Sequence, residues 1–246
     1  LMQDEVKNSI PSFLARNGYF QFNQQYQKSE RPYITIKIAH SLDGFISKGR
    51  GKGSQISNET SAAFVHDLRS RVDAVLISQR TALIDDPLLT SRINGLEIYT
   101  TRILLDRKLE ISESSMLVKT SSKHPLIIVT QNKPLETHWV FKKNIYKKIS
   151  LIVMGSKYKL ENIFRVLLDQ GIGHILVEPG PRLLASLLSL KTVDEFVEII
   201  SQKKLGSGLS IMNTEQTVEF LPPSFYILSK KFNLVDDIVK IWKLKK

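Results

Sequence analysis

The stretch 69–92 constrains the fold most, because it joins a helical pattern, a short apolar run and a polar turn. Residues 74–77 are all apolar and include two β-branched side chains, which predicts a buried strand. Apolar residues recur at helical spacing within residues 61–71, so a helix leads into this strand. Pro87 disfavours helix at the residue before it, and we expect a turn there.

Polar side chains therefore gather past the carboxyl end of a buried strand, where open α/β sheets bind ligands. They are Thr81, Asp85, Asp86, Thr90 and Arg92. For any one of them, a capped turn with solvated arginines is the alternative, but their concentration in one segment favours a ligand site.

Strand-like and helix-like segments alternate along the rest of the chain, which favours an α/β fold. Apolar, β-branched runs predict strands at 33–40, 102–106, 126–130, 149–154, 174–178 and 193–201. Residues 225–228 and 234–242 predict a closing antiparallel pair. Helices are expected at 160–170 and 182–190, and Asn58 is expected to cap the helix over 61–71.

The composition sets limits on the class of protein. At 246 residues the chain forms one domain or two small ones, and residues 1–30 are polar enough to predict a linker or N-terminal extension. No apolar run approaches the ~20 residues that span a bilayer, and no signal peptide is expected. Cysteine is absent, which excludes disulfides and thiolate metal sites and is consistent with the cytoplasm. The five histidines show neither i,i+4 pairing nor His-x-Glu, so we expect no metal site.

The net charge of +11 favours an anionic ligand: nucleic acid, a phosphorylated metabolite or a dinucleotide. Scattered lysine pairs on solvated faces are the alternative. The basic, glycine-rich segment 48–54 can cradle a phosphate, although it is not a Walker A loop, and a plain connecting loop explains it as well.

Three other positions point to an anion. Lys37 interrupts an otherwise apolar strand, and a buried lysine needs an acidic partner or an anionic ligand unless the strand end faces water. Glu178 ends a strand that runs through Pro-Gly-Pro into a helix, whose free amides attract anions. Arg107 follows another strand and can meet an adenosine 2′-phosphate, or lie in an exposed turn.

Four segments, 31–44, 69–92, 177–181 and 193–206, together resemble the reductase domain of the bifunctional riboflavin-biosynthesis deaminase–reductase. They stand in matching order within residues 17–240, and Asp-Asp-Pro-x-Leu-Thr-x-Arg is the most specific of the motifs. The resemblance implies a dihydrofolate-reductase-like fold over residues 31–246. This fold has a mostly parallel central sheet, helices on both faces and an antiparallel C-terminal strand pair. It also implies NADPH-dependent reduction of 5-amino-6-(5-phosphoribosylamino)uracil to its ribitylamino derivative.

Carried over by position, the resemblance implies substrate contacts at Ser54, Arg69, Leu89, Arg92 and Glu178. Lys37 stands where a strand lysine reaches the substrate's ribose or phosphate. The proton donor stays open among Lys37, Asp85, Glu178 and water. The implied cofactor contacts are Ala39, Thr81, Asp85, Arg107, Gly180, Pro181, Arg182, Leu183 and Leu184.

The sequence also departs from the family. Residues 54–57 lack the Trp that packs on the cofactor, Pro179 stiffens its turn, and 78–80 replace a small, Gly-rich turn. A non-catalytic homologue, another pterin- or pyrimidine-type reductase, and a basic nucleic-acid-binding module therefore stay as alternatives. The last lacks aromatic interleaving. We expect a homodimer, with no nucleic-acid or membrane partner. The zinc motif of the deaminase half is missing, so that step needs a separate or fused domain.

Overall fold

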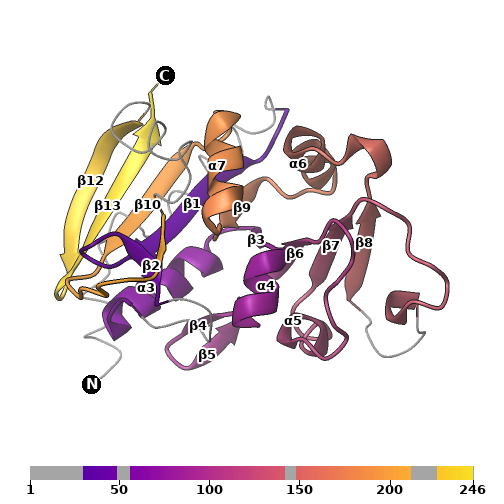
Figure 1. The fold of residues 1–246 in the computed structure, drawn as a ribbon, viewed down its shortest axis with the longest axis horizontal. Helices are drawn as coiled ribbons and strands as arrows, with labels where there is room; N and C mark the ends of the chain where they lie inside the picture. Colours follow the sequence, from indigo (N-terminus) through magenta and orange to yellow (C-terminus); the bar gives the residue numbers. More distant parts are fainter. Residues whose placement is uncertain (1–29, 49–55, 142–147, 212–225, 246) are drawn as a thin grey trace.

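The computed structural model describes residues 30–48, 56–141, 148–211 and 226–245. In these residues a nine-stranded sheet has the order β12-β13-β10-β1-β9-β3-β6-β7-β8 (Figure 1). Strands β10 through β8 in that order run parallel, while β13 and β12 are antiparallel to their neighbours. The predicted mostly parallel sheet with an antiparallel C-terminal pair is confirmed. The strands are β1 (Tyr33–His40), β3 (Ala74–Ser78), β6 (Thr101–Leu105), β7 (Leu126–Thr130), β8 (Ile149–Val153), β9 (His174–Val177), β10 (Glu195–Ile200), β12 (Tyr226–Leu234) and β13 (Asp237–Leu244).

Helices cover both faces of this sheet, as predicted. They are α3 (Glu59–Ser70), α4 (Gln79–Asp85), α5 (Met116–Lys119), α6 (Leu160–Asp169) and α7 (Pro181–Ser189), with 3₁₀ turns η3 (Trp139–Phe141) and η4 (Gly155–Lys157). In the view of Figure 1, α6 and α7 lie above the sheet and α3, α4 and α5 lie below it. Each set buries its apolar side chains in a separate core, one on either side of the strands.

The first helix of the described chain is fixed by its cap. The Asn58 side chain accepts a hydrogen bond from the Ser61 amide at 2.8 Å, which confirms the predicted N-cap. Ser61 Oγ donates to Asp237 Oδ2 at 2.6 Å, so the start of α3 is also tied to β13. The last turn of α3, which carries Arg69, therefore has a fixed place over the sheet.

Two short strand pairs complete the fold: β2 (Phe45–Ser47) with β11 (Leu209–Ser210), and β4 (Ser91–Ile93) with β5 (Leu96–Ile98). The β4–β5 hairpin was not predicted. Asn94 and Gly95 connect it with positive φ angles of 52° and 78°, and Asn-Gly is the strongest short signal for such a turn. The hairpin places Arg92 on a strand instead of in a loop.

Both edges of the sheet differ from the prediction. Strand β8 is half-exposed although its sequence predicts a buried strand, because it has only one neighbour. Strand β12 runs for nine residues where a shorter strand and a loop were expected. Its Lys231 is exposed and Lys230 half-exposed, which is typical of an edge strand protected against further pairing.

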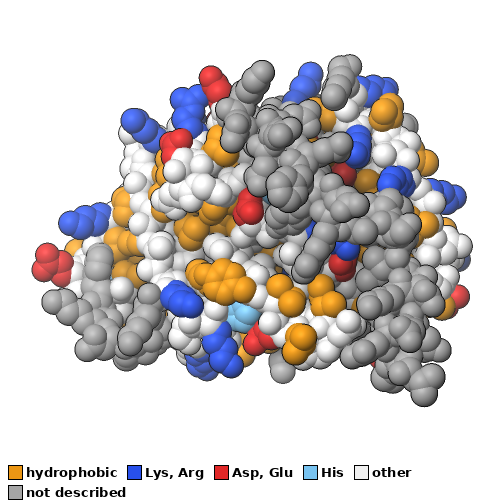
Figure 2. Space-filling model, turned by 180° about the vertical axis from the view of Figure 1, so that it is seen from behind, with side chains coloured by type: hydrophobic (Ala, Val, Ile, Leu, Met, Phe, Trp, Pro, Cys, Tyr) orange, Lys and Arg blue, Asp and Glu red, His pale blue; other side chains and the backbone are white. Residues whose placement is uncertain are grey.

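One face of the described part carries its charges dispersed (Figure 2). On the face shown in Figure 2, Lys and Arg side chains are scattered around the outline and mixed with acidic ones. This distribution fits solvated lysines better than a continuous basic patch. None of the helices in the described ranges combines the length and apolar character needed to span a bilayer.

Candidate active site at the carboxyl edge of the sheet

Glu178 stands at the centre of a charged cluster just past the carboxyl end of β9. Ile36 of β1 pairs with Val177, so Lys37 comes next to Glu178 on the α3 side of the sheet. Lys37 Nζ lies 3.0 Å from Glu178 Oε2. Arg69 reaches the same carboxylate from α3, with Nε donating to Oε1 at 2.7 Å and Nη2 to Oε2 at 3.1 Å. Two cations thus share one carboxylate, which leaves the cluster with a net positive charge.

The cluster is largely removed from solvent, since the side chains of Lys37, Arg69 and Glu178 are only 14%, 16% and 13% exposed. Burial by itself raises the pKa of Glu178, but the charges and hydrogen bonds of Arg69 and Lys37 hold this pKa well below its ordinary value. Glu178 is therefore ionised at neutral pH. It holds the two cations in place and has no proton to give.

The 85–92 segment joins this cluster through Thr90. Arg69 Nη1 donates to Thr90 O at 3.1 Å. Arg92 lies two residues further on β4, with its side chain exposed and its amide donating to His66 Nδ1 at 3.1 Å. Leu89 is 4% exposed, so its side chain belongs to the core and its backbone borders the site. The predicted substrate residues Arg69, Leu89, Arg92 and Glu178 therefore fall in one region.

His66 lies on α3 and was assigned no role from the sequence. It precedes Arg69 by one helical turn, and this spacing places both side chains on one face of α3. Burial lowers the pKa of His66, and Arg69 and Arg92 lower it further, so the ring is neutral at neutral pH. The i,i+3 spacing between His66 and Arg69 is the sequence signal that could have placed His66 beside the candidate site.

Thr81 and Gly180 lie close together at the carboxyl edge of the sheet. Thr81 lies in the first turn of α4, which was predicted as a loop and instead follows β3 as a short helix. A Cβ built on Gly180 would lie 3.7 Å from Thr81 Oγ1, so the amino end of α7 is next to α4. Gly180 is the N-cap of α7 and Pro181 follows it in the first turn, with no side-chain cap on the free amides.

The other turn residues predicted to contact a cofactor have different surroundings. Arg182 is exposed, whereas Leu183 packs against the core and Leu184 is 1% exposed within it. The Leu184 amide donates to Gly180 O at 3.0 Å. The side chain of Leu184 therefore does not face a ligand, and contacts at this turn must come from Arg182 and from backbone amides nearer its start. Asp85 is exposed at the end of α4, where desolvation raises its pKa.

Arg107 follows β6, the strand next to β3. Its Nε donates to Gln131 Oε1, and its guanidinium lies 5.6 Å from the ring centroid of Tyr158. Burial raises the pKa of Tyr158 to about 12, so its hydroxyl stays protonated. Ala39 is half-buried near the end of β1. Ser54 and most of the segment 48–54 lie outside the described residues.

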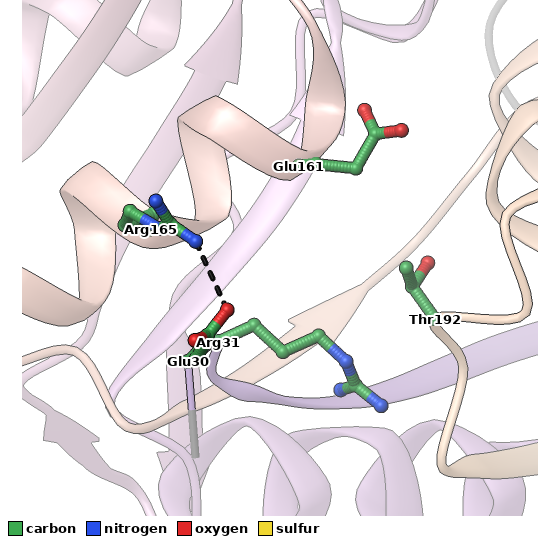
Figure 3. Close-up of a pocket in the computed structure, with 5 residues that line it drawn as sticks. All are labelled: Glu30, Arg31, Glu161, Arg165 and Thr192. Carbon is green, nitrogen blue, oxygen red and sulfur yellow. Dashed lines mark hydrogen bonds and ion pairs between the residues drawn. The ribbon is translucent and has the colours of Figure 1, made fainter.

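A cavity of about 350 Å³ lies elsewhere, at the amino ends of β1 and β10 (Figure 3). Glu30, Arg31, Glu161, Arg165 and Thr192 line it. Arg165 forms an ion pair with Glu30 at 3.0 Å, and Arg31 forms one with Asp194 at 2.7 Å. Both arginines of the cavity are therefore already paired with acidic side chains. Asp194 directly precedes β10 and therefore lies at this edge, opposite to the charged cluster. The cavity contains no predicted site residue.

Within the described ranges, no group of His, Asp and Glu side chains could hold a metal ion.

A mostly parallel α/β sheet with a positively charged cluster and an uncapped helix terminus at its carboxyl edge defines the class of protein: an open-sheet α/β protein, in which this edge is the usual position of a ligand site. The sequence profile of the RibD C-terminal domain matches residues 32–232. The chain belongs to this family.

Known relatives agree with this assignment. A riboflavin biosynthesis protein RibD of Aquifex aeolicus is 34% identical over 219 residues, which cover 89% of this chain and 59% of that protein. A 2,5-diamino-6-ribosylamino-4(3H)-pyrimidinone 5′-phosphate reductase of Archaeoglobus fulgidus is 29% identical over 175 residues, covering 67% of this chain and 78% of that protein. The chain spans little more than half of the RibD proteins that it matches.

The fold has a solved counterpart. The crystal structure of a diaminohydroxyphosphoribosylaminopyrimidine deaminase/5-amino-6-(5-phosphoribosylamino)uracil reductase from Thermotoga maritima matches with a TM-score of 0.73. It is 24% identical, and the match covers 92% of this chain and 60% of that one. The expected dihydrofolate-reductase-like fold is thereby confirmed.

Proposed function

We propose that this chain catalyses the NADPH-dependent reduction of 5-amino-6-(5-phosphoribosylamino)uracil to its ribitylamino derivative. The observation that carries the proposal is the Lys37–Glu178–Arg69 cluster. Its net positive charge suits a phosphorylated sugar, since arginine pairs well with phosphate. The names of the Aquifex and Archaeoglobus relatives support the same reaction class.

The residues along the carboxyl edge fit a dinucleotide. The uncapped start of α7 offers amides to a pyrophosphate, and the missing side chain at Gly180 leaves room beside Thr81. Arg107, which follows the strand beside β3, suits an adenosine 2′-phosphate. When bound, NADPH supplies the hydride that reduces C1′ of the opened ribose.

The chain's own residues then orient the substrate and supply a proton. We assign Arg69 and Arg92 to binding of the anionic substrate. The guanidinium of Arg69 is already held in place by its hydrogen bonds to Glu178 and Thr90. Reduction at carbon needs a proton at the neighbouring nitrogen. Glu178 is ionised and cannot give one, whereas the Lys37 ammonium carries protons and is held 3.0 Å from Glu178. We assign Lys37 as the donor, with Asp85 as the alternative because its pKa is raised.

Titration of NADPH fluorescence followed by a turnover assay tests the proposal. We expect NADPH to bind and to be oxidised only when the phosphoribosyl substrate is present. Failure to bind NADPH, or turnover of dihydrofolate in place of the phosphoribosyl compound, would contradict it. The second result would favour another pterin-type reductase on this fold.

A second candidate substrate is the 2,5-diamino pyrimidinone, because the Archaeoglobus relative carries that name. It has the same ribosyl phosphate, so the same cluster suits it. Offering both compounds at equal concentration separates the two, since kcat/KM will be higher for the native substrate.

We also propose that the chain acts in the cytoplasm as a homodimer, beside a deaminase domain that is fused or separate. The bifunctional name of the Thermotoga counterpart supports the deaminase partner. Exposed Ile227 and Leu228 on the edge strand β12 support self-association. Light scattering coupled to gel filtration measures the oligomeric state, and a monomer at micromolar concentration would contradict the dimer.

A further inference from the structure

Arg102 is a completely buried arginine in the middle of the sheet. It lies in β6 with 0% of its surface exposed, and no ion pair to it is found within the described residues. Its acceptors are neutral: Nη1 donates to Thr120 Oγ1 at 2.7 Å and to Leu88 O at 3.3 Å, and Nη2 donates to Leu117 O at 3.0 Å and to His124 O. Burial lowers its pKa to about 10, so the side chain stays charged at neutral pH. The charge of Glu97 opposes this shift but forms no ion pair with Arg102, and a buried charge without an ion pair is costly, which calls for a role that a neutral side chain would not fill.

The segment that Arg102 holds has an unfavourable backbone conformation. Asp86 and Leu89 have φ angles of 39° and 55°, in the left-handed region that side chains other than glycine rarely adopt. Such conformations persist only where the surroundings fix them. The segment is fixed twice to α5, first by the Met116 amide donating to Asp86 Oδ1 at 2.8 Å. The second tie is Arg102, which joins Leu88 O to the carbonyl of Leu117.

This turn leads directly into the active site. Thr90 follows Leu89, and its carbonyl accepts from Arg69. Two residues later the Arg92 amide donates to His66. A displacement of the turn would therefore move Arg92 and remove one of the contacts that orient Arg69.

We infer that Arg102 is a positioning residue for the substrate: it fixes the 86–89 turn and, through it, the placement of Arg69 and Arg92. The part of the inference that concerns catalysis rests on the proposed function. Arg102 touches no ligand itself and lies in the core on the α5 side of the sheet. None of the hydrogen bonds of Arg102 reaches Thr81 or Gly180, so we expect the NADPH contacts at these two residues to be kept when Arg102 is replaced.

The test compares Arg102→Met, which keeps an unbranched side chain and removes every donor, with Arg102→Lys, which keeps charge and reaches fewer acceptors. Hydrogen exchange at peptides covering 86–93 should quicken by about tenfold in Arg102→Met and by less in Arg102→Lys. The substrate KM should rise by about tenfold with the NADPH Kd within about twofold of wild type.

Leu167→Ala is the matched control, because Leu167 is fully buried in α6, in the core on the face of the sheet opposite to Arg102 and the 86–89 turn. It should lower Tm without changing exchange at 86–93 or the substrate KM. If Arg102→Met does not fold, Thr120→Val removes one acceptor of Arg102 and should give a smaller change in the same direction.

Two results would overturn the inference: exchange at 86–93 that rises no more than in the control, or an NADPH Kd that rises together with KM. The exchange measurement needs no substrate. A wild-type chain that lacks reductase activity would therefore refute the proposed function while leaving the positioning role to be judged on its own.

Discussion

Glu178→Gln probes the charged cluster most directly, because it keeps the shape of the side chain and removes only its charge. In the wild type one carboxylate lies between two cations, with Lys37 at 3.0 Å and Arg69 at 2.7 Å. The amide that replaces this carboxylate would leave the positive charges of Lys37 and Arg69 uncompensated. Its own N–H group would also face the N–H donors of these two side chains. Removing one partner of a buried ion pair costs about 3–5 kcal/mol, and the residual exposure here favours the lower value of about 3 kcal/mol.

For a domain of this size, about 3 kcal/mol corresponds to a fall in Tm of about 6–12 °C. The same change raises the charge of the cluster by one unit, so the variant should bind a free anion more tightly than the wild type. Inorganic phosphate should then recover part of the lost Tm, because a ligand that binds only the folded state stabilises it. Enzymatic turnover should still fall, since the guanidinium of Arg69 loses the carboxylate that orients it.

Thermal unfolding followed by fluorimetry, in phosphate and in sodium chloride of equal ionic strength, measures both effects. Glu161→Gln is the control: it makes the same charge change on α6, where the side chain is exposed and remote from the cluster. We expect it to leave Tm and the phosphate response unchanged. An unchanged Tm in Glu178→Gln, or a phosphate response no larger than that of the wild type, would refute the reasoning.

Three further predictions concern single residues. Arg69→Ala and Arg92→Ala should each raise the substrate KM by about 10- to 100-fold and leave the NADPH Kd nearly unchanged; loss of both affinities together would contradict the assigned roles. Gly180→Ala should keep Tm, because its Cβ would lie 3.7 Å from Thr81 Oγ1, but should raise the KM for NADPH, which steady-state kinetics measures. Burial lowers the pKa of His174 from 6.5 to about 4. Below pH 6.5 the unfolded chain binds a proton that the folded chain does not, so stability should fall by about 3 kcal/mol between pH 6.5 and 4. Urea unfolding should show a flatter pH profile in His174→Gln, and an unchanged profile would count against this assignment.

The central strands and the grouping of the candidate site residues at one edge were predictable because they depend on local pattern and chain order. Apolar runs such as 74–77 and 126–130 form strands in the middle of the sheet, where both faces are buried and the pattern is continuous. The polar residues after β3 and β9 follow from chain order, since parallel strands end at one edge. Lys37 stood out because a lysine within an apolar strand needs an acidic partner or an anionic ligand unless the strand end faces water, and in the structure its partner is Glu178.

Other features depend on contacts that no local pattern shows. The helix α4 is short and follows a buried strand directly, so its residues were taken for a loop. The exposure of β8 depends on which strand comes last in the sheet, which sequence order does not reveal. The role of Arg102 was missed because a lone arginine in a strand is usually solvated at one end, and here four neutral acceptors from distant segments enclose it. The Asn-Gly turn at residues 94 and 95 was visible and could have predicted the β4–β5 hairpin.

The position of β1 has a consequence for biosynthesis. This strand comes first among those described, yet its neighbours in the sheet are β9 and β10, which the ribosome makes only after most of the chain. Ile34, Ile36 and Ile38 are at most 5% exposed in the finished protein, but the two strands that flank them in the sheet are missing until then. A nascent chain stopped before β9 would carry an unpaired apolar strand, a known starting point for aggregation. Slow translation or truncation should therefore make this chain dependent on chaperones that shield its amino-terminal part.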